Sequence, residues 1–347
     1  MKGLILAGGF ATRLRPLSCS KPKLLFPLVG VPLIDRMVEW FARGGVTEAI
    51  LAVNHLSDKL RIEVARKKLA AKTVLSVEET PLGTGGPISL ARPMLSKDEP
   101  LIIANGDVIS DIDLRGLIAE HTRSAAEATV ALVSVEDPRP FGLATLDSNN
   151  RVIQFVEKSG RKHGRGWINA GVYVLNPGVI AMIPRGRPVS LEREIFPILA
   201  RRGKIIGWRH GGFWYDIGKI PDYVTANREL LNRAEYRKAE DPDWKMQSVE
   251  VTQPCFVGKN CFLGSGGKIG PNAILSERVT VGKDATVRET IVFEQTTLGE
   301  NCVVEDAIVG EGVIVGRDAK IEKGSIIAGQ VFIPDGTVIR PGSIILN

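Results

Sequence analysis

Short apolar runs alternate with amphipathic stretches over the first two thirds of the chain. Candidate strands, each a short run of apolar or β-branched residues, cover residues 3–7, 49–53, 74–77, 101–104 and 129–135. Apolar residues at helical spacing predict helices over residues 33–43, 57–68 and 114–121. This alternation is typical of an α/β fold with a mainly parallel, doubly wound sheet.

The pattern changes after residue 140. Segments 142–146, 152–156 and 172–175 look like strands with no helix between them, which predicts that part of the sheet is antiparallel. Helical spacing returns over residues 190–202 and 221–238 and ends at Glu240-Asp241-Pro242-Asp243. We therefore predict a first domain over residues 1–240 and a linker over residues 241–256.

From residue 257 onward an aliphatic residue recurs about every sixth position. The series comprises Val257, Leu263, Ile269, Leu275, Val281, Val287, Val292, Leu298, Val304 and Val309, and it continues to Ile345. Small or β-branched residues, among them Cys261 and Cys302, stand four positions after the aliphatic ones. The pattern resembles the hexapeptide-repeat left-handed β-helix, in which three units close one triangular turn. We predict about five such coils over residues 257–347, with both cysteines packed in the core.

Composition and charge narrow the function classes. The apolar start, residues 1–7, is too short for a membrane span and does not fit a signal peptide, which predicts a cytoplasmic protein. The four cysteines show no CxxC spacing and the four histidines are scattered, so the sequence gives no support for a zinc site. Net charge is +10 over residues 1–240 and −4 over residues 241–347. Because the basic residues are dispersed and no aromatic pattern accompanies them, we expect small phosphorylated ligands instead of nucleic acid or membrane.

A glycine-rich turn follows the first strand. Ala7-Gly8-Gly9 leads into Thr12 and Arg13, and Lys21-Pro22-Lys23 comes soon after. Backbone N–H groups in such a turn can cradle phosphate oxygens, and the cations add favourable charge. Gly-Gly on its own equally fits a structural turn.

The whole string resembles the signature of the sugar-phosphate nucleotidyltransferases, Gly-Gly-x-Gly-Thr-Arg-Leu-x-Pro-Leu-Thr followed by Pro-Lys-Pro-Leu. This chain has Ala11 at the third glycine, Ser18 for Thr and Leu24 for the second proline. Ala11 disfavours a left-handed backbone, so we expect a loop of different shape.

Further segments resemble this family in the family's order along the chain. They are Glu78-Glu79-Thr80-Pro81-Leu82-Gly83-Thr84, Asn105-Gly106-Asp107, Phe141-Gly142, Phe155-Val156-Glu157-Lys158, Asn169-Ala170-Gly171, Ser190-Leu191-Glu192-Arg193-Glu194-Ile195-Phe196-Pro197 and Trp214-Tyr215-Asp216-Ile217-Gly218. The mannose-1-phosphate guanylyltransferase branch is similar in this combination and in its C-terminal β-helix. The resemblance implies a Rossmann-like mixed-sheet domain that binds a nucleoside triphosphate and a sugar 1-phosphate.

The same resemblance implies roles for individual residues. Asp107 and Asp216 match the positions that hold Mg²⁺, which prefers a few carboxylate oxygens together with phosphate and water. Arg13 and Lys23 match residues that grip the triphosphate, and Lys158 matches the residue that meets the sugar phosphate. Nucleotide contacts are implied for Ala7, Gly8, Gly9, Thr12, Glu78, Pro81, Gly83 and Thr84, and sugar-phosphate contacts for Gly142, Glu157, Lys158 and Asn169.

The resemblance further implies that Glu78 contacts the base, because it matches the base-contacting position beside the Pro-Leu-Gly-Thr motif. Guanine offers two adjacent N–H donors that suit a carboxylate, whereas uracil and thymine suit an amide side chain. Our hypothesis is therefore that the chain joins GTP to mannose 1-phosphate and releases GDP-mannose and pyrophosphate.

Three other functions stay open at this stage. One is a glucose-1-phosphate nucleotidyltransferase that uses dTTP or UTP, since the phosphate and metal motifs are shared. The second is a non-catalytic sensor or regulatory subunit, suggested by Ala11 and Leu24 but disfavoured by the retained cations and acids. The third, an additional acyltransferase, is disfavoured because residues 241–347 contain no histidine. An uncapped β-helix end further predicts a homo-oligomer formed through that domain.

Overall fold

The computed structural model describes residues 1–54, 57–157, 164–236 and 248–347. The chain divides into two compact units: Met1–Phe10 with Ile34–Asp216, and Ala11–Leu33 with Ile217–Asn347. The short segment after the first strand thus belongs to the unit that contains the β-helix. The predicted linker falls partly on residues 237–247, outside the described residues, and the domain boundaries proposed from the sequence stay a prediction.

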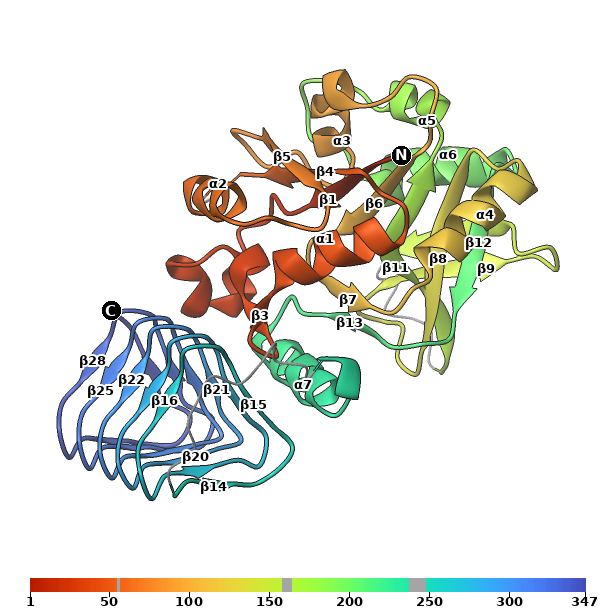
Figure 1. Ribbon diagram of the computed structural model, residues 1–347. Coiled ribbons are helices and arrows are strands. Elements are labelled where there is room, and N and C mark those ends of the chain that lie inside the picture. The colour runs from red at the N-terminus through yellow and green to blue at the C-terminus, as the bar shows by residue number, and fades with distance from the viewer. Residues whose placement is uncertain (55–56, 158–163, 237–247) are drawn as a thin grey trace. The chain divides into compact units, whose positions relative to one another are not determined.

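A mixed nine-stranded sheet forms the centre of the first unit, as the sequence pattern predicts (Figure 1). Its strands are β1 (Lys2–Leu6), β4 (Glu48–Val53), β5 (Lys72–Val77), β6 (Leu101–Asn105), β8 (Ala128–Val135), β9 (Gly142–Leu146), β10 (Val152–Glu157), β11 (Gly166–Leu175) and β12 (Ile205–His210). The order β10-β9-β11-β6-β1-β4-β5 is extended by β8, which pairs with β11 and β12. Strands β1, β4, β5 and β6 are parallel, and β11 is antiparallel to β6, β8 and β9.

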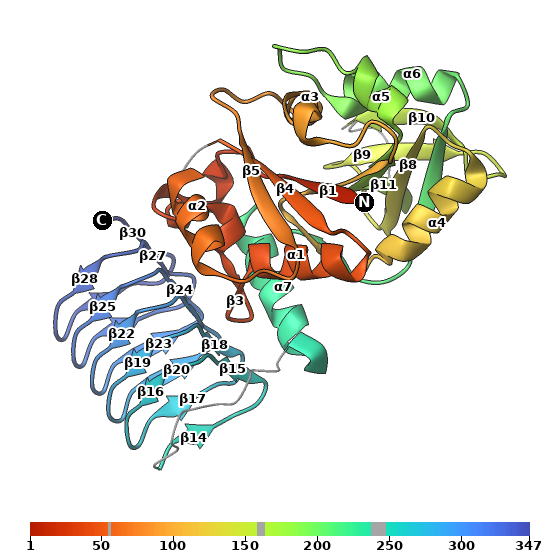
Figure 2. The ribbon, with the colours of Figure 1, turned by 45° about the horizontal axis from the view of Figure 1, so that its top comes forward.

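Helices cover both faces of this sheet (Figure 2). They are α1 (Leu33–Arg43), α2 (Ser57–Arg66), α3 (Gly86–Leu90), the 3₁₀ turn η4 (Arg92–Met94), α4 (Leu114–Ser124), α5 (Pro177–Met182), the π-helical turn η5 (Leu191–Ile195) and α6 (Phe196–Arg201). On one face, α3, α5, η5 and α6 share a buried apolar cluster with the sheet. On the other, Phe41 of α1 packs so closely on Gly3 that a Cβ there would lie 2.5 Å from its ring. The apolar periodicity of the sequence therefore identifies this layered core correctly.

The topology directs several loops to one edge. Because β1, β4, β5 and β6 run in the same direction, the loops that follow them start at the same edge of the sheet, where open α/β sheets bind their ligands. The backbone ladder continues past the strand ends, since Ala7 N–H donates to Ala52 O and Gly106 N–H to Leu6 O. This edge therefore carries the glycine-rich turn and the Asn105–Asp107 segment.

The second unit is built on a parallel β-helix (Figure 1). Its three sheets are β14-β17-β20-β23-β26-β29, β15-β18-β21-β24-β27-β30 and β16-β19-β22-β25-β28. The strands are β14 (Glu250–Val251), β15 (Cys255–Val257), β16 (Phe262–Leu263), β17 (Lys268–Ile269), β18 (Ala273–Leu275), β19 (Thr280–Val281), β20 (Thr286–Arg288), β21 (Ile291–Val292), β22 (Thr297–Leu298), β23 (Val303–Glu305), β24 (Ile308–Val309), β25 (Ile314–Val315), β26 (Lys320–Ile321), β27 (Ile326–Ile327), β28 (Phe332–Ile333), β29 (Val338–Ile339) and β30 (Ile344–Ile345).

The predicted repeat register of the β-helix is confirmed. The aliphatic series from Val257 to Ile339 forms one buried cluster, and Ile345 packs against it. Phe262 pairs with Thr280, 18 residues and one coil later. Ile274 pairs with Ile291 after only 17 residues, because that coil contains one five-residue unit. Cys261 and Cys302 are buried in this core as predicted, and burial raises the pKa of the Cys302 thiol to about 12.

The second unit also contains shorter elements from both ends of its sequence. They are the 3₁₀ turns η1 (Thr12–Leu14), η2 (Leu17–Cys19), η3 (Lys23–Leu25) and η6 (Ala234–Tyr236), the hairpin β2 (Pro27–Leu28) and β3 (Val31–Pro32), and helix α7 (Ile220–Leu231). In the β15 sheet, the outward-facing Phe256, Ile274 and Ile291 are buried. A sheet face with buried outward residues needs a cover, and Phe256 lies under Gly30 of the hairpin.

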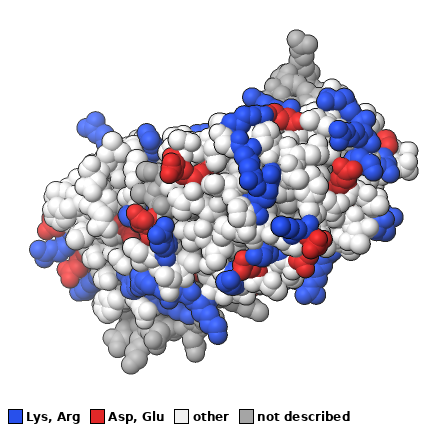
Figure 3. Space-filling model, turned by 90° about the horizontal axis from the view of Figure 1, so that it is seen from above, with Lys and Arg blue, Asp and Glu red and all other residues white. Residues whose placement is uncertain are grey.

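Two surface properties bear on function. No helix in the described ranges combines the length and the apolar composition that a bilayer crossing requires. On the face shown in Figure 3, Lys and Arg side chains form separate groups with Asp and Glu among them.

Candidate active site

The turn after β1 and the start of the Glu78 loop meet at the sheet edge. The Oε1 atom of Glu78 lies so close to Gly8 that a Cβ at that position would be 1.8 Å away. Gly9 is exposed, with no atom within 4 Å of its would-be Cβ. Gly8 is therefore required by close approach, and Gly9 leaves the turn open to a ligand.

Glu78 is a buried carboxyl group with a fixed orientation. Its backbone N–H continues the sheet ladder to Val53 O, and its Oε2 accepts a 2.9 Å hydrogen bond from Leu82 N–H. The side chain is only 4% exposed. Burial raises the pKa of Glu78, and the Leu82 hydrogen bond offsets part of that rise. Two predicted nucleotide contacts, Gly8 and Glu78, are thus brought together.

The Pro81–Thr84 turn packs against Val189, which lies in the segment before η5. Gly83 has φ +75° and lies against Val189 O, which would be 2.5 Å from a Cβ, while Gly85 N–H donates to the same oxygen over 2.8 Å. Pro81 and Gly83 are exposed. The turn therefore has the glycine that its left-handed backbone needs and presents its outer side to solvent.

The predicted metal ligands Asp107 and Asp216 are brought together by a two-stranded sheet. Strand β7 (Val108–Ser110) pairs with β13 (Trp214–Asp216), and the register sets Asp216 opposite Val108, the neighbour of Asp107. Both aspartates are half-buried. Carboxylates 109 positions apart in sequence therefore lie at one place in the fold.

This place suits a hard cation in its donor chemistry. The Oδ1 of Asn105 is buried and accepts no hydrogen bond from the described residues. The described part of the chain has no cluster of three or more His, Cys, Asp or Glu that could hold a metal by itself. Mg²⁺ is commonly held by one or two carboxylates and completed by substrate phosphates and water, so the residues fit this ion.

The predicted sugar residues come from three neighbouring strands. Glu157 of β10 is in register with Gly142 of β9, and Ile168, the residue before Asn169 in β11, is in register with Leu143 of β9. Gly142 has open space where a side chain would lie. Lys158 lies outside the described residues. The backbone thus places Gly142, Glu157 and Asn169 on adjacent strands.

A hydrogen-bond relay joins the predicted sugar side to the predicted nucleotide side. Asn169 Nδ2 donates to Tyr173 Oη over 2.8 Å, and Tyr173 donates to Glu192 Oε1 over 3.1 Å. The Thr84 hydroxyl donates to Glu192 Oε2 over 2.7 Å and accepts from Leu191 N–H. Burial, followed by the charge of Glu192, raises the pKa of Tyr173, so the phenol stays a donor. The sequence analysis assigns no role to Glu192 or Tyr173, although Glu192 stands in a segment that resembles the family and Tyr173 follows the Asn169-Ala170-Gly171 segment by two residues.

Glu192→Gln tests how much this hydrogen-bond relay contributes to the stability of the fold. Because Glu192 accepts from Thr84, Ser190 and Tyr173, we expect the variant to lose about 1.5–3 kcal/mol of unfolding free energy. Urea denaturation measures the loss. Glu120→Gln, which removes an exposed pair with Arg123 within α4, should cost less than about 1 kcal/mol. Equal effects of the two changes would contradict the relay.

The predicted triphosphate cations belong to the second unit. Thr12 and Arg13 are exposed residues of η1, and Lys23 is the half-buried first residue of η3. Ala11, expected to alter the loop, adopts the left-handed conformation that glycine would take, with φ 49° and ψ 36°. Such a backbone costs a non-glycine residue about 1–2 kcal/mol. Ala11 O accepts from Leu14 N–H and from the Ser18 hydroxyl, which compensates part of this cost.

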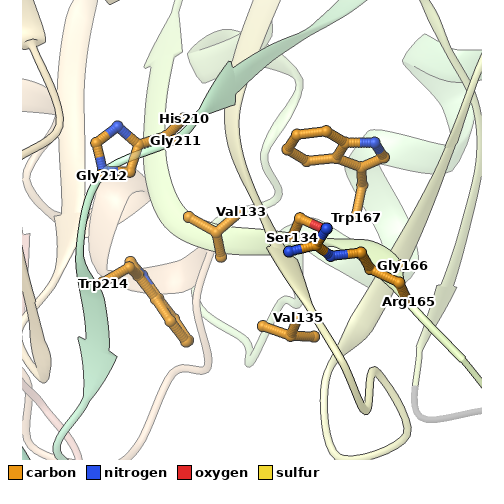
Figure 4. Close-up of a pocket in the computed structure, with 10 residues that line it drawn as sticks. All are labelled: Val133, Ser134, Val135, Arg165, Gly166, Trp167, His210, Gly211, Gly212 and Trp214. Carbon is orange, nitrogen blue, oxygen red and sulfur yellow. The ribbon is translucent and has the colours of Figure 1, made fainter.

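A separate cavity of about 550 Å³ lies in the first unit. Figure 4 shows its lining, with the rings of Trp167 and Trp214 on opposite sides of Val133 in that view. Trp214 donates from its indole to Ala170 O and lies two residues before Asp216 in β13. Among the described residues, none of those predicted to contact the nucleotide, the sugar or the metal lines this cavity.

Comparison with known proteins connects this geometry with a family. Residues 2–233 match the family described as nucleotidyl transferase, and residues 251–347 match the GMPPB C-terminal domain. The chain belongs to the nucleotidyl transferase family. The family's expected mixed sheet and β-helix are both confirmed.

Several relatives of this nucleotidyltransferase are named for guanylyl transfer. A protein of Arabidopsis thaliana named "Probable mannose-1-phosphate guanylyltransferase 2" is 34% identical over 100% of this chain and 96% of its own. Mannose-1-phosphate guanyltransferase beta-A of Xenopus laevis is 37% identical over 78% of this chain and 74% of its own. Crystalline HddC from Yersinia pseudotuberculosis is 28% identical, with a TM-score of 0.58 over 66% of this chain and 99% of HddC, and has also been solved with GMP-PN.

Proposed function

We propose that this nucleotidyltransferase joins GTP and mannose 1-phosphate to give GDP-mannose and pyrophosphate. The observation that carries the reaction type is the meeting of Asp107 and Asp216 through the β7–β13 pair, in a unit whose sheet edge also holds Gly8 and Glu78. The names of the Arabidopsis and Xenopus relatives support mannose 1-phosphate as the sugar.

The reaction is a displacement at phosphorus. An ionised oxygen of the sugar phosphate attacks the α-phosphorus of GTP, a new P–O bond forms, and the bond between the α-phosphorus and its bridging oxygen to the β-phosphate breaks. Because that oxygen is already a nucleophile at neutral pH, no activating Ser, Cys or His is required. The protein's task is alignment and charge neutralisation.

The scheme gives roles to the predicted metal, phosphate and sugar residues. Asp107 and Asp216 would hold Mg²⁺, which when bound supplies positive charge to the phosphate oxygens. Arg13 and Lys23 neutralise the triphosphate and the departing pyrophosphate. Lys158 meets the sugar phosphate. The strands that carry Gly142, Glu157 and Asn169 present the groups that contact the sugar hydroxyls.

Base choice is assigned to Glu78. One of its carboxylate oxygens is occupied by Leu82 N–H, and the other lies against the bare backbone of Gly8. A fixed, buried acceptor suits the adjacent N1–H and N2–H donors of guanine, whereas uracil and thymine present a single N3–H donor between two carbonyl acceptors. The solved complex of HddC with GMP-PN supports a guanine nucleotide in this fold.

A matrix of nucleoside triphosphates against sugar 1-phosphates, with pyrophosphate release as the readout, tests the proposal. We expect GTP with mannose 1-phosphate to give the highest kcat/KM. Highest activity with dTTP or UTP and glucose 1-phosphate would replace our assignment with a glucose-1-phosphate nucleotidyltransferase. Absence of turnover for every pair with Mg²⁺ present would favour a sensor or regulatory subunit.

We also propose that the β-helix mediates self-association between copies of the chain. Along the β16 sheet, the outward ladder Phe262–Thr280–Thr297–Ile314–Phe332 leaves Phe262 and Phe332 more than 60% exposed. Ile314 of the same ladder is 50% exposed, and exposed apolar side chains of this kind can be covered by a second copy of the chain.

Light scattering at micromolar concentration should therefore detect an oligomer. Phe332→Ser should weaken the association about tenfold. The control Ile153→Ser removes an exposed apolar side chain from β10 and should leave the association unchanged. A monomeric wild-type chain would refute the proposal.

A further inference from the structure

The segment Ala11–Leu33, which carries Arg13 and Lys23, is packed on the β-helix and on α7. Phe26 contacts Phe293 of the β-helix at a ring distance of 5.6 Å and Tyr223 of α7 at 5.7 Å. Phe26, Phe293 and Tyr223 are fully buried. An aromatic cluster of this kind fixes the chain just after η3.

The β2–β3 hairpin provides a second anchor. Val29 and Gly30, its turn residues, both have positive φ, at 46° and 69°. That backbone is unfavourable for a β-branched residue, yet Val29 N–H donates to Asn227 Oδ1 of α7 over 2.8 Å and the side chain is fully buried. The surroundings therefore determine this conformation against the local preference of Val29.

Lys21 provides the third anchor, and it is ionic. Sequence reasoning placed Lys21 among the cations near the phosphates, but its side chain is buried with its ammonium group on Glu294 and, at 2.9 Å, on Glu311 Oε2. Burial opposes the charge of Lys21 most strongly, but the two carboxylates outweigh it and raise the pKa. Lys21 is therefore a charged group already engaged by carboxylates of its own chain.

The two glutamates occupy equivalent corners of successive coils. Glu294 stands three residues after Ile291 and Glu311 three residues after Ile308, and those isoleucines are paired in the β21–β24 ladder. Stacked carboxylates repel each other, and a cation shared between them removes that repulsion. A buried ion pair often adds little net stability, but it can select one arrangement of the packed segments. The Lys21 contacts are therefore better suited to positioning this segment than to stabilising the fold.

We propose that Lys21, Glu294 and Glu311 are positioning residues for nucleotide transfer. Lys21 stands two residues before Lys23, so fixing its ammonium group on the β-helix sets where η3 begins. The β-helix then contributes to catalysis by holding the segment that carries Arg13 and Lys23. This inference rests on the proposed function, because those cations act there on the triphosphate.

Lys21→Met tests the inference in the full-length protein. Loss of the ammonium group should lower kcat/KM for the nucleotide about tenfold to a hundredfold, as misplacement of positioned groups does, while KM for the sugar 1-phosphate changes less than about twofold. Lys21→Arg, which keeps the charge, should restore most of the activity. The double change Glu294→Gln with Glu311→Gln should reproduce the kinetic loss.

Glu305→Gln is the matched control. It removes an exposed pair with Arg288 on another sheet of the same β-helix and should leave both kinetic constants unchanged. Should Lys21→Met fold poorly, Glu311→Gln leaves Glu294 in place and should still give a smaller loss confined to the nucleotide. Wild-type kinetics in Lys21→Met and in the double glutamine variant would overturn the inference, as would an equal loss for both substrates.

Hydrogen exchange gives a readout that needs no turnover. In Lys21→Met, amides of residues 12–25 should exchange faster, whereas amides of β1 should not change. Unchanged exchange over residues 12–25 would overturn the inference that Lys21 holds this segment on the β-helix, even if the enzyme were inactive. Failure of the proposed function would instead appear as a wild-type chain without turnover for any substrate pair.

Discussion

Asp107→Asn is expected to lower turnover with Mg²⁺ by at least about a thousandfold. The amide keeps the size of the side chain but removes a negative charge from the pair that the β7–β13 register brings together. A metal ion contributes several kcal/mol of charge stabilisation in such displacements, and about 4 kcal/mol corresponds to a thousandfold. Pyrophosphate release at saturating substrates measures the effect.

Asp98→Asn is the control for this change. Asp98 is exposed in the loop before β6, and the same chemical substitution there should leave turnover unchanged. Asp216→Asn should match Asp107→Asn, and the double variant should be hardly worse than either single one, because groups that act as a unit are not additive. Wild-type turnover in Asp107→Asn would remove this residue from the metal site.

Glu78→Gln is expected to reduce the preference for GTP over UTP and dTTP by about a hundredfold or more. The glutamine carbonyl can keep the bond from Leu82 N–H, which leaves an NH₂ donor in the place of Oε1 beside Gly8. That change presents a donor to the two donors of guanine and leaves buried polar groups unpaired, the situation in which enzymes discriminate most strongly. The ratio of kcat/KM values for the three nucleotides measures it.

Glu79→Gln is the matched comparison, since Glu79 is the exposed neighbour of Glu78. It should leave base preference unchanged. A Glu78→Gln variant that still prefers GTP by the wild-type ratio would contradict the assignment of base choice to this residue. A uniform loss with all three nucleotides would instead indicate that Glu78 only shapes the turn at Gly8.

The sequence predicts the fold well where burial repeats along the chain. In the β-helix, one buried aliphatic residue per unit determines both register and coil, so even the five-residue units at 287–291 and 304–308 appear in the strand pairing. In the sheet, apolar runs identify β1, β4, β5 and β6. The π-helical turn η5 has no such signal, because it departs from the 3.6-residue period within a segment predicted as one helix.

The candidate site is predicted less completely, because its contacts join distant segments. Nothing local in the sequence signals that Val108 and Asp216 pair or that Glu192 joins Thr84 to Tyr173. Lys21 is the clearest case, since a lysine between a predicted turn and a signature lysine looks like a phosphate ligand. Only the tertiary structure shows that its charge is engaged by Glu294 and Glu311.

The contact between Gly8 and Glu78 constrains how substrate preference can evolve in such a chain. Glutamate and glutamine have the same length and planar end group, so either one fits above a residue that lacks a side chain. If Glu78 selects the base as proposed, a switch between purine and pyrimidine nucleotides would need only this isosteric exchange and would leave the neighbouring turn unchanged. Any side chain introduced at position 8 would displace the residue-78 carboxyl or amide group, so Gly8 is required with either residue at position 78.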